Sequence, residues 1–523
     1  MRRSVIYQVA GLLAVTFIVI GFVYVSASDD LQRHHQHQHR PSEADLGVCL
    51  LCCDYTFCTH LPLVIIDTFG QDIPGRPLLF GPREFGADIY ASELWGQFET
   101  TPEGETEIEV FISVIDNHNT WNHINDIPVH ETLAMMRLRG NSSRFFDKPN
   151  YRISLIDSDA ENNSLPLLGM NPHFEWALHG PFLDKTLMRS YMWMNIAAEV
   201  MGPGHFVPEV RFFELIIDGE YQGLYVLMET VRVNPYRVSL SRHREGLPTT
   251  SFVARRDTFT GTPERTINTF ATYTFRIDAE SNTELLYPRI ALQNDNVRDY
   301  VAINISSTEY LLHSHEIIWT PRIYERYIDM NSFVNFYIIN EFIANHDLWV
   351  GSTYIHKDIR GRLVAGPVWD FNNVMDNFLI SMPVDGFLLA DRGWFDRLMM
   401  CPYFTDSVIR RWHDLRRGTL SEERLVNYMQ EVEDWLGSAI DRNFEVWGHS
   451  FEPTEVSRLA RRNPTSAEIA EGITIRDLNP SSFEEAMEWK RDYMIERGRW
   501  LDEYIVILRQ FSHPSRHALW TLE

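Results

Sequence analysis

Apolar residues follow two patterns along this chain, with short alternating or β-branched runs in the first half and helical spacing in the last third. Runs of the first kind, each bounded by turn residues, predict strands. These strands are expected at residues 63–67, 107–116, 133–138 and 151–156. Two more apolar runs, between residues 212 and 228, flank Asp218-Gly219 and predict an antiparallel hairpin with a tight turn.

Helical spacing of apolar residues predicts four helices. They are expected at residues 185–201, 333–344, 420–440 and 482–508. The last begins at Ser482, and Glu485 follows three residues later, which is the spacing of a capping box. Apolar residues recur every seven positions along it and indicate a packing face. They are Met487, Met494, Leu501 and Leu508. An α+β protein with a mixed or antiparallel sheet and a helical C-terminal part is therefore expected.

The N-terminus carries a different pattern. Residues 4–28 contain no charged residue and follow Arg2 and Arg3. The run exceeds the roughly 20 apolar residues that span a bilayer. The two arginines predict a signal anchor, a single-pass transmembrane helix with its N-terminus in the cytoplasm and the main domain outside. The run ends in a cleavage-like sequence at residues 25–27, so removal after residue 27 is left open.

Residues 29–60 are predicted to be a polar, Cys-rich linker. Its histidines are His34, His35, His37 and His39, and a solvated spacer is preferred to a metal-binding tract. Its cysteines are Cys49, Cys52, Cys53 and Cys58. Zinc could use such spacing, but outside the cytoplasm disulfides are the preferred interpretation, and their three possible pairings stay open. Cys401 is expected to be a buried small hydrophobe.

Composition changes this picture in two ways. The chain has 523 residues, of which 44% are hydrophobic and 13% aromatic, enough for one large or two medium domains. Its formal net charge is −25, with 72 acidic residues against 47 lysines and arginines. Because binding to a nucleic acid needs clustered cations against the phosphates, this charge argues against a nucleic-acid partner.

Candidate chemistry begins where an apolar run, residues 364–369, ends in Asp370, with Asn372 close behind. A carboxylate at a strand end beside further oxygen ligands is how many enzymes hold Mg²⁺ against phosphate oxygens. The structural alternative is a strand end with an Asx turn. Upstream, Asp347 follows the predicted helix 333–344 and precedes a short predicted strand, 353–356. This order matches a kinase catalytic loop followed by its metal-binding aspartate.

A basic segment lies between two of the predicted strands, around a Gly/Ser turn. Its cations are Arg139, Arg144, Lys148 and Arg152. Cations near such a turn suit a polyphosphate, and a solvated basic loop is the alternative. Arg189, five residues after Asp184, is either a further phosphate contact or a helix-face ion pair, and the residues alone favour the ion pair.

Five segments, taken in order, resemble the spore coat protein H (CotH) kinase family. They are 138–144 with Lys148 and Tyr151, Asp184 with 187–189, then 221–229, 345–347 and 367–371. The resemblance covers roughly residues 61–410. It implies an atypical, reduced protein-kinase-like fold that transfers the γ-phosphate of ATP to Ser or Thr of proteins with a divalent metal. The expected divisions are 1–28, 29–60, 61–415 for the kinase domain and 416–523 for a helical extension packed on it.

The resemblance also implies roles for single residues. Asp347 would be the catalytic-loop acid that orients the substrate hydroxyl. The metal, Mg²⁺ or Mn²⁺, would be held by Asp370, Asn372 and Ser352. The cofactor-binding residues for ATP would be Arg139, Arg144, Lys148, Arg189 and Glu229. The implied partner is a surface or spore-coat protein, at the cell surface or in a spore envelope.

Two positions depart from the family pattern. Asn372 stands where the family usually has an aspartate, and Ser352 where it often has an asparagine. An amide offers an oxygen to a metal but no charge. The alternative function is therefore a catalytically degenerate, CotH-like surface protein that binds or adheres. A hydrolase that pairs Asp347 with Asp370 is a third interpretation, which leaves the basic segment without a role.

Overall fold

The computed structural model describes most of the chain in ten ranges. These are residues 33–49, 57–78, 97–140, 142–257, 265–275, 282–314, 322–348, 351–377, 382–454 and 464–513. Within these ranges no helix combines the length and the apolar character that crossing a membrane requires. The predicted signal anchor at residues 4–28 lies outside the described residues.

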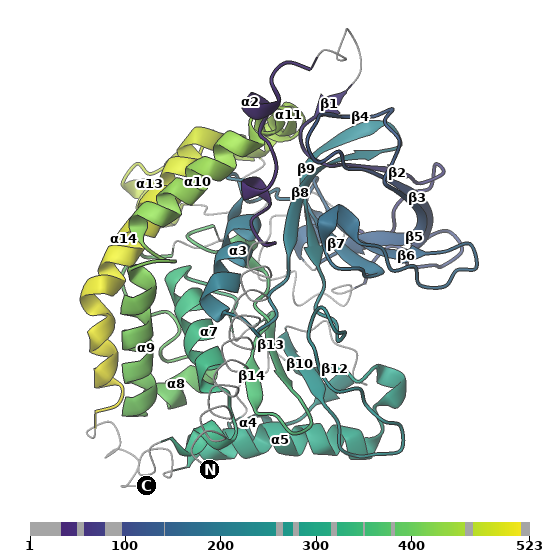
Figure 1. The fold of residues 1–523 in the computed structure, drawn as a ribbon. Helices are drawn as coiled ribbons and strands as arrows, with labels where there is room; N and C mark the ends of the chain where they lie inside the picture. The colour runs from purple at the N-terminus through teal and green to yellow at the C-terminus, as the bar shows by residue number, and fades with distance from the viewer. Residues whose placement is uncertain are drawn as a thin grey trace, which may run out of the picture.

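Seven strands close into a barrel (Figure 1). In order around it they are β2 (Leu63–Asp67), β3 (Ile108–Ile115), β5 (His130–Arg139), β6 (Asn150–Ile156), β7 (Glu175–His179), β9 (Glu220–Glu229) and β8 (Val210–Ile217). Neighbours are antiparallel except β2 and β8, whose parallel pairing closes the ring. In β5 buried residues alternate with half-buried ones, as expected when one face of a strand points to a core.

The β8–β9 hairpin confirms the predicted turn. Asp218 and Gly219 have φ angles of 50° and 82°, and a two-residue hairpin turn favours such positive values. The Asp218 carboxylate also accepts hydrogen bonds from the backbone N–H and the hydroxyl of Thr68, at 2.8 and 2.7 Å. The turn is thereby joined to the end of β2.

A second sheet of five antiparallel strands lies below the barrel in the view of Figure 1. Its order is β11 (Thr266–Ile267), β12 (Asn282–Tyr287), β10 (Phe252–Asp257), β13 (Thr353–Lys357) and β14 (Leu363–Ala365). A short ribbon, β1 (Cys58–Thr59) with β4 (Asn122–His123), completes the described strands.

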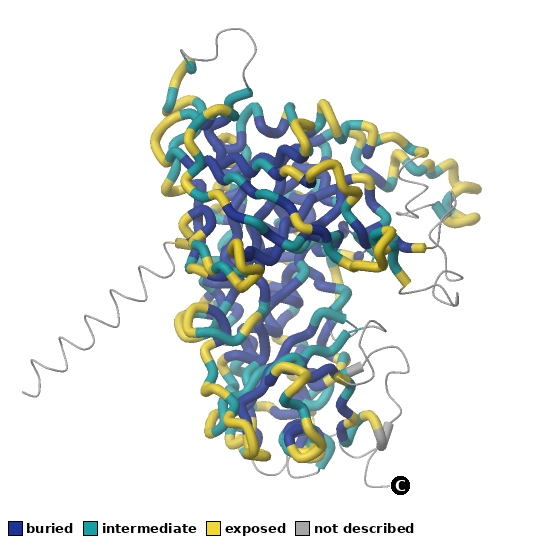
Figure 2. Tube along the Cα trace, turned by 90° about the vertical axis from the view of Figure 1, so that its right-hand side faces the viewer, coloured by how far each residue is buried: buried dark blue, intermediate teal, exposed yellow. Residues whose placement is uncertain are grey.

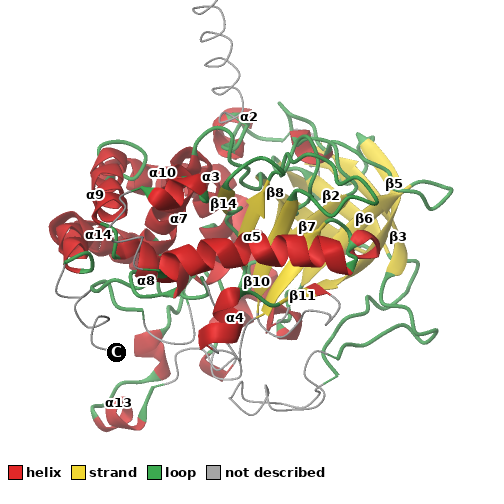
Figure 3. Ribbon diagram, turned by 90° about the horizontal axis from the view of Figure 1, so that it is seen from below, coloured by secondary structure: helices red, strands yellow, loops and turns green. Residues whose placement is uncertain are grey.

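Most helices gather on one side of the molecule and the barrel strands on the other, and α5 runs across the middle of the view in Figure 3. In chain order the α-helices are α2 (Glu43–Leu46), α3 (Arg189–Met201), α4 (Phe270–Phe275), α5 (Asp295–His313), α7 (Met330–Phe342), α8 (Gly393–Met399), α9 (Pro402–Arg416), α10 (Glu422–Leu436), α11 (Ser438–Trp447), α13 (Ser466–Ala470) and α14 (Phe483–Tyr504). The predicted helix 420–440 is interrupted at Gly437, whose φ of 49° ends α10. The expected α+β class and the helical C-terminal part are confirmed, whereas the kinase-like form of the fold stays a prediction.

Two large hydrophobic cores stabilise the described structure. One fills the barrel, and the other runs without interruption from α3 through β10, β13 and α7 to α14. Figure 2 shows buried residues continuing from the upper to the lower part of the molecule. All four residues of the predicted seven-residue stripe are buried, which confirms it as a packing face. Cys401 is also buried, at 1% exposure, as predicted.

The N-terminal segment 33–49 differs from the solvated spacer expected there. His34, His35 and His37 are buried. The side-chain amide of Gln36 accepts from the backbone N–H of Phe212 at 2.7 Å and donates to its carbonyl at 3.2 Å. The segment thus satisfies backbone groups of β8, a tertiary contact that its polar composition does not reveal.

Candidate active site

Three carboxylates from distant parts of the chain come together beside the five-stranded sheet. Asp257 ends β10, Asp347 follows α7, and Asp370 follows β14. Burial, together with the negative charges of Asp347 and Asp257, raises the pKa of Asp370 to about 6. We call these three residues the acidic cluster.

The loop after α7 is shaped so that it presents Asp347. Ala344 adopts a φ of 50°, which ends the helix. Asn345 then donates from its amide to Asn340 Oδ1 at 2.8 Å and accepts from the Asp347 backbone N–H at 3.2 Å. The Asp347 side chain is 30% exposed. A carboxylate so placed can be reached by a hydroxyl arriving from solvent.

The backbone around Asp370 is held in an unusual conformation. Asp370 has φ 65° and ψ 58°, and Ser352 has a φ of 49°. Such left-handed conformations cost about 1–3 kcal/mol in a residue other than glycine and concentrate at functional sites. The Ser352 hydroxyl donates to Asp370 Oδ2 at 3.3 Å. A side chain added at Gly351 would lie 3.3 Å from Asp257 Oδ1, so the loop also passes close to the third carboxylate.

The donor set at this site fits a hard divalent cation. Asn372 Oδ1 and Asn373 Oδ1 are buried, and neither has a hydrogen-bond partner among the described residues. An unsatisfied buried oxygen costs about 1–3 kcal/mol, and a metal ion would satisfy it. With the Asp370 carboxylate and the Ser352 hydroxyl these amides form an all-oxygen set, which Mg²⁺ and Mn²⁺ prefer.

Arg139, at the end of β5, is a cation that faces Asp370 of the acidic cluster. Its guanidinium lies 4.9 Å from the ring centroid of Trp369, and its positive charge lowers the pKa of Asp370 against the effect of burial. Within the described ranges its guanidinium makes no hydrogen bond or salt bridge. Its planar donors are therefore available to an anionic ligand such as a phosphate.

Two other cations of the basic segment are engaged elsewhere. Arg144 donates to the carbonyls of Gly140 and Gly75 at 2.6 and 2.9 Å. Lys148 is 1% exposed, and its Nζ donates to the Leu224 carbonyl and to Asn443 Oδ1, both at 2.6 Å. Burial lowers the pKa of Lys148 well below its usual value. The Lys148 bond to Asn443 joins the barrel to α11, and none of these contacts is with the acidic cluster.

Arg189 positions the loop that follows Asp370. It donates to Asp184 Oδ1 at 2.5 Å, so the ion pair that the sequence favoured is present. Its Nε also donates to the Val374 carbonyl at 3.1 Å. The N-terminus of α3 is thereby tied to the chain four residues beyond Asp370.

Glu229 lies at the end of β9 and is buried. Its Oε2 accepts from the Glu209 backbone N–H at 3.0 Å, and its Oε1 lies 3.4 Å from Arg237 Nε. Burial, together with the charge of Glu209, raises the pKa of Glu229 to about 7. None of these contacts is with the acidic cluster.

Sequence reasoning missed Asp257 and its neighbour Arg255. The Arg255 guanidinium lies 3.1 Å from Asp257 Oδ2 and donates to Glu284 at 2.6 Å. The available signal was the run from Phe252 to Asp257, in which an apolar start leads into two arginines and a terminal acid. That run is β10, but only the sheet shows that its end lies beside Asp370.

A group of oxygen donors beside an arginine that can bind an anion is typical of a site for a metal ion and a phosphate. Comparison with family models then identifies the family. The model of the CotH kinase protein matches residues 136–501, more than half of the chain, and the protein belongs to this kinase-like family. In general terms such a family implies ATP, a divalent metal and a protein substrate. A search of curated proteins finds no match.

Proposed function

We propose that this protein transfers the γ-phosphate of ATP to serine or threonine residues of another protein. The observation that carries the proposal is the acidic cluster with Arg139 beside it. The two buried amide oxygens after Asp370 support the same assignment, because they lack any other described partner.

Each residue of the site has a distinct part in this reaction. Asp370, Asn372 and Ser352 would hold Mg²⁺ or Mn²⁺, which neutralises phosphate charge when bound. Arg139 would bind phosphate oxygens through its guanidinium. Asp347 would accept a hydrogen bond from the acceptor hydroxyl, orient its oxygen toward the phosphate and take its proton.

The other residues that the sequence predicted to bind ATP have structural roles in this proposal. Arg144 and Lys148 stabilise the barrel and its contact with α11, and Arg189 positions the Asp370 loop. Glu229 is buried beside Glu209 and Arg237. We therefore propose that Arg139 provides the principal phosphate contact.

The second candidate function, a degenerate binding protein, is favoured by the amide at Asn372, which brings no charge. Asp257 weighs against it, because it adds a third carboxylate whose charge reaches Asp370. Phosphoryl transfer requires both a nucleotide and a metal, whereas adhesion requires neither.

The test is transfer of label from γ-labelled ATP to an acceptor protein, or to the kinase itself, with Mg²⁺ and Mn²⁺ tried separately. Asp347→Asn should retain ATP affinity and lose about 10²–10⁴-fold in rate, because it removes a group that acts on the acceptor. Asp434→Asn, an exposed position on α10, is the matched control. If the wild type transfers no label with either metal, the binding function replaces this one.

The location of the protein is a separate proposal. The charge-free run at residues 4–28 after Arg2 and Arg3 supports a signal anchor, with residues 29–523 outside the cytoplasm. A reporter that works only in the cytoplasm, fused after Glu523, should stay silent. An active reporter would refute the topology without touching the kinase assignment.

A further inference from the structure

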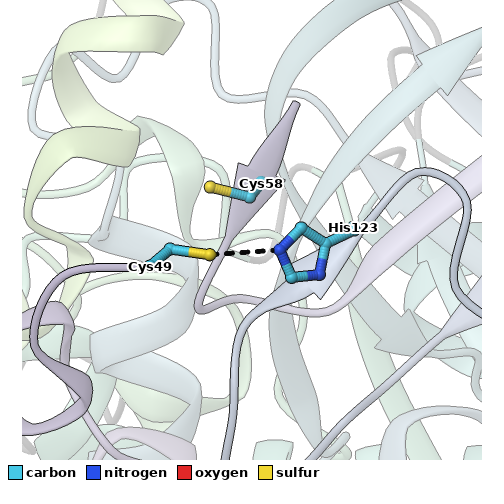
Figure 4. Close-up of side chains that lie close together, drawn as sticks. All are labelled: Cys49, Cys58 and His123. Atoms are coloured by element: carbon cyan, nitrogen blue, oxygen red, sulfur yellow. Dashed lines mark hydrogen bonds between the residues drawn. The ribbon is translucent and has the colours of Figure 1, made fainter. Parts of the chain in front are cut away.

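A second chemical cluster lies on the β1–β4 ribbon, beside α2 and α11 at the top of Figure 1. Cys58 and His123 are paired across this ribbon in register, so their side chains are close neighbours. Cys49 follows α2 and places its Sγ 3.1 Å from His123 Nε2 (Figure 4). One ligand atom from each of the three residues lies within 4.8 Å of the other two.

The imidazole of His123 is fixed by a carboxylate behind it. His123 Nδ1 lies 3.3 Å from Asp126 Oδ2, and the same oxygen accepts from the His123 backbone N–H at 2.9 Å. The side chain of Asn117 donates to it as well, at 2.8 Å. A carboxylate at one ring nitrogen sets the tautomer and turns the other nitrogen toward a metal in many histidine sites. Here the other nitrogen points to the sulfur of Cys49.

Two sulfurs and one imidazole nitrogen are a zinc-type donor set, unlike the all-oxygen set at Asp370. Bonds of about 2.3 Å to sulfur and 2.0–2.1 Å to nitrogen place tetrahedral ligands ~3.6 Å apart. Here Cys49 Sγ and His123 Nε2 are 3.1 Å apart, and the other two separations are no longer than 4.8 Å. Cys58 is disulfide-bonded, however, and only a thiolate binds zinc.

We propose that reduction of the disulfide holding Cys58 converts this cluster into a zinc site formed by Cys49, Cys58 and His123. A trialkylphosphine reduces the disulfide by taking the oxygen of one water, while the two sulfurs take its two hydrogens. A dithiol does so by becoming a disulfide itself. The Cys49 and Cys58 thiols then release their protons to solvent as sulfur–zinc bonds form, and His123 binds through the lone pair on Nε2.

The site would connect the N-terminal segment to the barrel. That segment already contacts the barrel through Arg40, which donates to both oxygens of Asp116 at 2.5 and 2.8 Å. Zinc at Cys49 would add a second attachment nine residues further on, in the reduced state. This inference is independent of the proposed kinase function, because no residue is shared.

Metal content of the full chain, with and without phosphine treatment, tests the proposal. Reduced protein dialysed against zinc should retain one zinc per chain, and cobalt in its place should give a thiolate charge-transfer band in the near ultraviolet. Unreduced protein should retain none. Cys49→Ser and His123→Ala should abolish retention, and Asp126→Asn should weaken affinity by about 10–100-fold. Cys401→Ser, a buried cysteine elsewhere, should bind as the wild type does.

Circular dichroism of each variant establishes that loss of zinc is not loss of fold. Each of three results would overturn the proposal. The first is reduced wild-type protein without zinc. The second is Cys49→Ser that retains zinc as tightly as wild type, since the histidine tract at 34–39 would then be the binding segment. The third is equal zinc retention with and without reduction, which would refute the redox dependence.

Discussion

The carboxylate of Asp370 is held where a negative charge is costly. It is buried, it lies near two other carboxylates, and its backbone is in the left-handed region. Its pKa of about 6 lies above the ordinary value, so the folded state binds a proton more readily than the unfolded chain does. The loss of folding stability caused by ionising Asp370 is absent below about pH 4, grows as the pH rises toward 6 and reaches its full size above that value.

Asp370→Asn should therefore stabilise the metal-free protein while it removes metal-dependent ATP binding. At pH 7.5 the gain in the free energy of unfolding should be about 1–3 kcal/mol, and at pH 4 it should be close to zero. Urea unfolding in the presence of a chelator measures it. Asp434→Asn is the control and should change little. A loss of stability at pH 7.5 would contradict the assignment of Asp370 as a strained metal ligand.

Substitution of Arg139 should affect ATP binding, whereas substitution of Lys148 should affect stability. Arg139→Met should weaken Mg-ATP binding with little change in stability, because its guanidinium has no described hydrogen-bond partner. Lys148→Met should cost about 1–3 kcal/mol, since it removes the lysine donor from the buried Leu224 carbonyl and leaves Asn443 Oδ1 with only the Leu224 backbone N–H, at 3.1 Å. Calorimetry with Mg-ATP and urea unfolding distinguish the two. Loss of ATP affinity in folded Lys148→Met would show that the lysine, not Arg139, is the phosphate contact.

At the scale of elements, the attachment of the N-terminal segment should depend on pH. Burial lowers the pKa of His37 to about 3, and burial together with the charges of Arg211 and Arg33 lowers that of His34 to about 3. His35 faces both histidines, and His37 also faces His39. The groups around the His37 ring are Tyr191 at 3.0 Å and the half-exposed Glu431 at 3.5 Å.

The free energy of unfolding should be at its full value above about pH 7, where these histidines are neutral in both states. It should decrease as the pH falls below 6.5, because the unfolded chain then takes up protons and the folded one does not. Between pH 7.5 and 5.5 the wild type should lose about 1–3 kcal/mol more than a His34→Gln/His37→Gln variant. Urea unfolding at the two values measures this difference. Identical pH dependence in both proteins would mean that the segment is already detached at neutral pH.

At the scale of the whole molecule, one hydrophobic core joins the C-terminal helices to α7, the helix that precedes Asp347. Arg497 of α14 is 1% exposed and donates to Glu341 of α7 at 2.5 Å. The carboxylate of Glu341 also accepts from the backbone N–H groups of Leu388 and Leu389, both at 2.8 Å. The helix that leads to Asp347 is therefore held by a residue 156 positions later in the chain.

Removing residues 416–523 should abolish cooperative folding, because it exposes the core face of α7 and leaves the Glu341 charge buried and unpaired. In the full chain Arg497→Ala should cost about 3–5 kcal/mol for the same reason. Thermal unfolding followed by circular dichroism tests both. A truncated chain that still unfolds cooperatively would show that 61–415 folds without the extension.

Local pattern by itself determined much of the element map. Periodicity and turn chemistry act within a few residues, so the strands at 63–67 and 151–156, the Asp218-Gly219 hairpin and the packing face of α14 were all predicted. The same local logic selected Asp347 and Asp370, because an acid that follows a strand or helix is visible in the sequence.

Tertiary structure alone decided which charged groups meet. Barrel closure depends on the pairing of β2 with β8, which are about 150 residues apart, and no local pattern encodes that register. The placement of Arg139 near Asp370, the burial of Lys148 against Leu224 and Asn443, the arrival of Asp257 and the burial of the histidines at 34–37 depend on such long-range contacts. A lysine in a solvated loop and a lysine under a helix have the same sequence signature, and only the packed neighbours, which exclude water and supply acceptors, tell them apart.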